Sequence, residues 1–69
     1  MTNGKVKWFD ENRGFGFIRP DEGGGDVYLR LSPDECNALR PLEDGQPVRF
    51  DFQLMESGKM AALNVAKFG

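Results

Sequence analysis

The sequence has 69 residues and a net charge of −2, with one cysteine and no histidine. A chain of this length is expected to form one small domain, over residues 1–69, with a thin core. The single cysteine excludes an internal disulfide, and a structural zinc site would lack its usual ligands, so no metal or cofactor is expected.

Hydrophobic runs are short throughout the chain. No run approaches the roughly 20 apolar residues that span a membrane, and no basic and then apolar leader opens the sequence. With its lone cysteine, the chain is expected to be a soluble cytoplasmic protein without a membrane partner.

The charges are distributed unevenly. Residues 1–19 carry four basic and two acidic groups, whereas residues 20–46 carry two basic and seven acidic groups. Residues 47–69 carry three basic and two acidic groups. Because local charge decides where an anion docks, a nucleic-acid partner is compatible with the negative total.

Basic and apolar residues alternate at the start of residues 4–10, G-K-V-K-W-F-D, which predicts a half-buried strand. Val6 should face the core and Lys7 the solvent. The alternation fails at Trp8 and Phe9, where two large rings follow one another. We expect Trp8 to point outward and Phe9 inward, with a bulge as the alternative to regular pairing.

Residues 13–19, R-G-F-G-F-I-R, form the next predicted strand, joined to the first by a tight polar turn. Two rings on one strand face usually indicate a core, but burying the arginines on that face would be costly. An outward face of rings and guanidinium groups fits unpaired nucleobases and their phosphates. The outward set is Arg13, Phe15, Phe17 and Arg19, and the inward set is Gly14, Gly16 and Ile18.

A flexible loop at residues 21–25, D-E-G-G-G, separates this strand from a third. The loop lacks the lysine and the following helix of a P-loop, so nucleotide triphosphate binding is not expected. Residues 26–31 alternate again. The predicted inward set is Val27, Leu29 and Leu31, and the outward set is Asp26, Tyr28 and Arg30.

A short helix is predicted after Ser32, because Pro33 suits the first helical position and Glu35 completes a capping box. Pro41 should end it. Two more strands follow, and five short strands in so few residues are expected to close into a small barrel. Their predicted inward residues are Val48, Phe50, Phe52 and Leu54, then Ala61, Leu63 and Val65.

Five segments in order resemble the bacterial cold-shock protein family over nearly the whole chain. They are G-K-V-K-W-F-D, R-G-F-G-F-I, D-V-Y-L-R-L-S, L-E-D-G-Q-P-V-R-F and A-A-L-N-V. The resemblance implies an all-β, five-stranded antiparallel Greek-key barrel of the OB type, with one short helical turn after the third strand. It also implies two ribonucleoprotein motifs, at residues 13–18 and 27–31. Members of this family bind single-stranded RNA and DNA, and many act as RNA chaperones or regulators of transcription or translation.

Carried over by position, the resemblance implies a binding surface made of Lys7, Trp8, Arg13, Phe15, Phe17, Asp26, Tyr28 and Arg30. The Asp26 carboxylate would accept hydrogen bonds from a base edge. Arg30 replaces the family's usual histidine, while Leu31 and Leu39 replace aromatic residues. Smaller departures are Tyr28 for phenylalanine, Arg13 for lysine and Met60 for proline. Lost stacking predicts weaker binding than in typical relatives and a steeper salt dependence. Leu31 has an equal alternative interpretation, as a core residue of its strand.

The alternative function is a protein-interaction module with little nucleic-acid binding, because two aromatic positions are lost beside an acidic segment. A monomer is expected, with a swapped dimer through residues 23–25 as a variant. An enzyme is not expected, since no histidine can serve as a base and Cys36 lacks a partner that would make it a thiolate.

Overall fold

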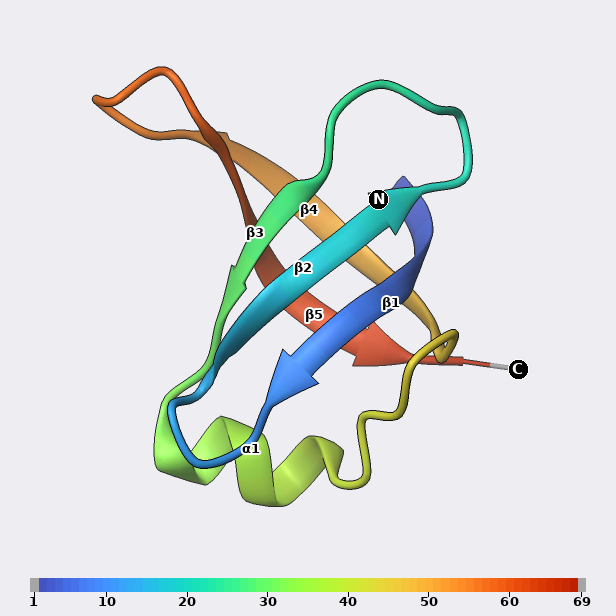
Figure 1. The fold of residues 1–69 in the computed structure, drawn as a ribbon, viewed down its shortest axis with the longest axis vertical. Coiled ribbons are helices and arrows are strands. Elements are labelled where there is room, and N and C mark those ends of the chain that lie inside the picture. Colours follow the sequence, from blue (N-terminus) through green and yellow to red (C-terminus); the bar gives the residue numbers. More distant parts are fainter. Residues whose placement is uncertain (1, 69) are drawn as a thin grey trace.

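The computed structural model describes residues 2–68, which form five strands and one helix. In chain order they are β1 (Thr2–Asp10), β2 (Phe15–Pro20), β3 (Val27–Arg30), α1 (Pro33–Leu39), β4 (Pro47–Leu54) and β5 (Met60–Lys67). The strands close into a barrel in the order β1-β2-β3-β5-β4 (Figure 1). The predicted all-β barrel with one short helix after the third strand is confirmed. Closure is completed by β3 and β5, which pair in parallel.

Alternating apolar side chains fill the barrel. Strands β1, β2 and β3 each turn one set of residues inward, as predicted, and the outward residues between them form the opposite face. The most deeply buried side chains are Phe50, Ile18, Leu29, Val6, Val27 and Val48.

Helix α1 lies across the lower end of the barrel, next to the turn that joins β1 and β2 (Figure 1). Its predicted start is confirmed: Glu35 N donates to Ser32 Oγ at 3.2 Å, and Ser32 N donates to Glu35 Oε1 at 3.0 Å. The helix buries Cys36, and Leu42 beyond its end is also in the core. Within residues 2–68, no helix is long and apolar enough to cross a membrane.

The prediction that β4 is a core strand along its whole length is wrong. Val48 and Phe50 are fully buried, but Phe52 is 43% and Leu54 68% exposed. Among the residues that the structure describes, β1 pairs with β4 from Pro47 to Phe50, and the second half of β4 has β5 as its paired neighbour. The β4–β5 hairpin therefore projects from the barrel, at the upper left of Figure 1.

The inward set predicted for β5 is also wrong in part. Val65 packs against the core, but Leu63 is 43% exposed and the buried residue is Ala62. The register between β4 and β5 shifts near Asn64, whose φ of 53° is left-handed. An extra residue at such a bulge exchanges the two faces of the strand.

Candidate nucleic-acid interface

A bulge in β1 sets the direction of the tryptophan. The β1–β2 register shifts between Val6 and Trp8, so that Val6 lies opposite Ile18 and Trp8 opposite Phe17. The extra residue lets Val6 stay in the core while Trp8, 37% exposed, joins the outer face. Phe9 then packs against the core. The predicted orientations of Trp8 and Phe9 are confirmed, and the bulge is their cause.

Four side chains from three strands form a surface that we call the aromatic platform: Trp8, Phe15, Phe17 and Tyr28. The Trp8 ring centroid lies 5.5 Å from that of Phe15 and 5.4 Å from that of Phe17. The Tyr28 centroid lies 6.2 Å from Phe15 and 5.8 Å from Phe17. These spacings are those of aromatic pairs in contact. The predicted outward faces of the first three strands thus meet in one continuous surface.

Gly16 allows the close approach of strands beneath the rings. A Cβ atom there would overlap the Trp8 carbonyl oxygen and lie 2.7 Å from the Phe9 Cα. Any larger residue would push β1 and β2 apart. The two glycines of the R-G-F-G-F segment therefore have different roles. Gly16 leaves room for the neighbouring strand, whereas Gly14, with φ of 73°, allows the left-handed turn into β2.

Charged groups border the platform in pairs. Lys7 Nζ lies 2.8 Å from Asp26 Oδ2, and Arg13 Nε lies 3.7 Å from Asp10 Oδ2. Arg30 is exposed at the end of β3, opposite Phe15 in the register. The predicted binding residues thus lie on one face, and the bond between Lys7 and Asp26 was not expected from the sequence.

The Lys7–Asp26 pair is exposed enough to be weak. The relative exposures of the two side chains are 44% and 31%. We expect Asp26→Asn to lower the free energy of unfolding by less than about 1 kcal/mol. Urea denaturation followed by Trp8 fluorescence measures this. Asp21→Asn, which breaks the similar Lys5–Asp21 pair at 3.0 Å, is the matched control. A loss above roughly 2 kcal/mol from Asp26→Asn alone would show that the pair is structural.

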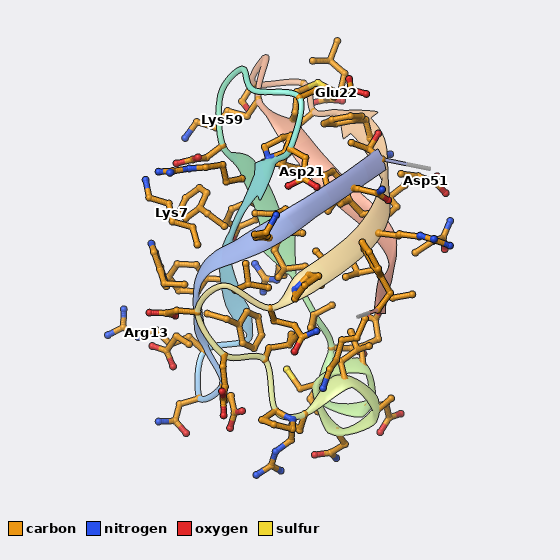
Figure 2. All side chains as sticks on the ribbon, turned by 90° about the vertical axis from the view of Figure 1, so that its right-hand side faces the viewer. Lys7, Arg13, Asp21, Glu22, Asp51 and Lys59 are labelled. Carbon is orange, nitrogen blue, oxygen red and sulfur yellow. The ribbon has the colours of Figure 1, made fainter. Side chains whose placement is uncertain are left out.

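Two residues beside the platform were not predicted from the sequence as part of the site. Lys59, just before β5, and Met60, its first residue, line a shallow depression of about 390 Å³ together with Phe17, Asp26 and Tyr28. Figure 2 shows Lys59, Lys7 and Arg13 along one side of the molecule and Asp51 on the other. The alternation pattern could not place Lys59 there, because it reaches the platform through the pairing of β3 with β5.

Leu31 and Leu39 lie below this surface. Leu31 is 6% exposed and belongs to the core, and Leu39 is partly buried against it. The interpretation of Leu31 as a core residue is confirmed. The aromatic platform therefore ends at Phe15 and Tyr28, and Arg30 lies beyond it.

Comparison with known proteins agrees with this geometry. Residues 2–68 match the family model described as the 'Cold-shock' DNA-binding domain. The chain belongs to the cold-shock domain family. It is 46% identical over 66 residues to a probable cold shock protein, y4cH, of Sinorhizobium fredii, covering 94% of this chain and 96% of that protein.

Two further cold-shock relatives show similar agreement. The chain is 47% identical over 62 residues to the cold shock-like protein CspC of Shigella flexneri, covering 90% of this chain and 88% of that protein. It is 44% identical over 66 residues to the cold shock protein CspA of Rhizobium meliloti, covering 94% and 96%. The resemblance noted in the sequence is therefore confirmed at the level of the family.

Proposed function

We propose that this cold-shock domain binds single-stranded RNA or DNA with little sequence preference, and that it acts as an RNA chaperone or as a regulator of transcription or translation. The observation that carries the proposal is the aromatic platform: four rings, 5.4 to 6.2 Å apart, on the outer face of the barrel. Every base has a π-face, so stacking on such rings tolerates any sequence.

The chemistry requires no covalent step. Rings stack with bases that have left a duplex, while Lys7, Arg13 and Arg30 neutralise nearby phosphates. Bases held in this way cannot pair again, so binding alone keeps a strand open without ATP. The Asp26 carboxylate adds a hydrogen-bond acceptor at the platform's edge. Because exposed ion pairs are weak, Asp26 can exchange its bond to Lys7 for a bond to a base.

We further propose that binding is weaker than in the relatives whose pattern this chain resembles. Leu31 and Leu39 stand where that pattern has rings, and both pack on the core. A base stacked on an aromatic ring contributes about 1 to 3 kcal/mol. Arg30 recovers part of this through charge, which makes the salt dependence steeper. We place the activity in the cytoplasm, where the free, buried thiol of Cys36 stays reduced.

Fluorescence anisotropy of a labelled oligopyrimidine tests the proposal. The single strand should bind, and the duplex of the same sequence should bind much more weakly, because its bases are already stacked. The cold shock-like protein CspC of Escherichia coli, 45% identical to this chain, is a suitable partner for side-by-side measurement. Tighter binding by this chain than by CspC at every salt concentration would contradict the proposal that binding is weaker here. Failure of the folded protein to bind either strand would favour a protein-interaction module.

A further inference from the structure

A second concave region lies at the end of the platform, between the turn at residues 11–14, the end of β3 and helix α1. We call it the arginine hollow. Its volume is about 770 Å³. Three arginines line it, Arg13, Arg30 and Arg40, and no aromatic residue does so among the residues that the structure describes. The hollow therefore offers guanidinium groups but no ring on which a base could stack.

The hollow adjoins the platform at Phe15. Phe15 lies opposite Arg30 in the β2–β3 register, and Arg13 precedes Phe15 by two residues. Both arginines line the hollow, and both neighbour Phe15, Arg30 across the β2–β3 pairing and Arg13 along the chain. A strand that leaves the rings at Phe15 would therefore meet Arg13 or Arg30 next.

The cations of the hollow are only loosely neutralised. Arg40 Nε lies 3.7 Å from Glu11 Oε2, and Arg13 Nε lies 3.7 Å from Asp10 Oδ2, both longer than the 2.8 Å of the Lys7–Asp26 pair. Arg30 has no ion pair within residues 2–68. Glu35, the other carboxylate of the hollow, is engaged in the helix cap. A phosphate can replace such exposed partners at little cost, and arginine binds phosphate by two parallel hydrogen bonds.

We propose that the arginine hollow binds the phosphodiester groups of nucleotides that extend past the aromatic platform. This inference rests on the proposed function. It divides the interface into two parts: rings that hold bases, and a region beyond them that holds the backbone through charge. Strands long enough to reach the hollow then bind more tightly and with a steeper salt dependence than strands that cover the rings alone.

The test compares thymidine strands of about four and about eight nucleotides, lengths within the range that one OB fold accommodates. Arg40→Gln is the main variant, because Arg40 lines the hollow but lies outside the platform. For the longer strand, it should weaken binding and lower the slope of log K against log salt by roughly 0.7. The shorter strand should bind as it does to the wild type. Arg49→Gln, on β4 across the barrel, is the matched control and should change the affinity for neither strand.

Glu11→Gln should change the affinity for the longer strand in the opposite direction. Misfolding would not raise affinity, so it cannot account for that result. The substitution removes the carboxylate that pairs with Arg40, whose guanidinium keeps its 3.2 Å hydrogen bond to Asn37 Oδ1, so the longer strand should bind more tightly and with a steeper slope. An equal effect of Arg40→Gln on both strands, or on neither, would overturn the inference. An equal loss of affinity for the longer strand in Arg49→Gln would also overturn the inference, because it would show that removing any positive charge weakens binding. If the wild type fails to bind even the shorter strand, the proposed function itself fails.

Discussion

Replacing Phe17 with alanine is expected to weaken the binding of a short single strand by about 5- to 150-fold, which corresponds to the roughly 1 to 3 kcal/mol of one base-aromatic stack. Phe17 is central, because its ring contacts both Trp8 and Tyr28. Its loss removes one stacking surface and leaves Phe15 as the remaining platform ring in contact with Trp8 and Tyr28. Anisotropy of a labelled strand measures the change without depending on the environment of Trp8.

Phe52→Ala is the matched control for this loss. The Phe52 ring is 43% exposed and lies on β4, away from the platform, where it contacts Phe50 at 5.2 Å. Its removal should lower stability without changing the affinity for the strand. If Phe17→Ala binds like the wild type while its circular dichroism is unchanged, the rings do not hold the bases.

Gly16→Ala is expected to have the largest effect on stability. The added Cβ would meet the backbone of Trp8 and Phe9, which cannot move aside as a flexible side chain could. Overpacking commonly costs about 1 to 3 kcal/mol and more where backbone must shift. A domain of this size has only about 3 to 10 kcal/mol in total. The variant should therefore unfold at a much lower urea concentration than the wild type.

Gly25→Ala is the control for the glycine substitution. A Cβ at Gly25 would meet nothing within 4 Å, and its φ lies outside the left-handed region. Its urea midpoint should stay close to that of the wild type or rise slightly, because alanine restricts the unfolded chain. If Gly16→Ala and Gly25→Ala have the same midpoint, β1 and β2 do not approach as closely as the structure shows.

The inward and outward faces of the first three strands could be predicted from alternation together with the kinds of residue on each face. Arginines flanking the rings of β2 showed which face was outward, and the order of small and large residues showed which face was inward. The rings of Trp8, Phe15, Phe17 and Tyr28 could thus be placed on one side before their contacts were known. Their assembly into one platform depends on the register between the strands, of which the adjacent rings of Trp8 and Phe9 were the one sign in the sequence.

The second half of the fold could not be predicted in the same way, because its faces depend on long-range pairing. The pattern of β4 is regular, but Phe52 and Leu54 lie beyond the point where β1 covers the strand. The bulge near Asn64 reverses β5 and has no strong sequence signal, since asparagine is common in ordinary turns. Lys59 and the arginine hollow likewise depend on segments that meet only in the closed barrel.

Trp8 is the chain's one tryptophan and lies within the aromatic platform, whose rings we propose to stack with unpaired bases. Titration of a short oligopyrimidine at low salt, followed by Trp8 fluorescence, therefore tests this stacking directly. We expect saturable quenching that is reversed by added salt and is much weaker with the corresponding duplex. An unchanged Trp8 signal from the folded protein throughout the titration would contradict it.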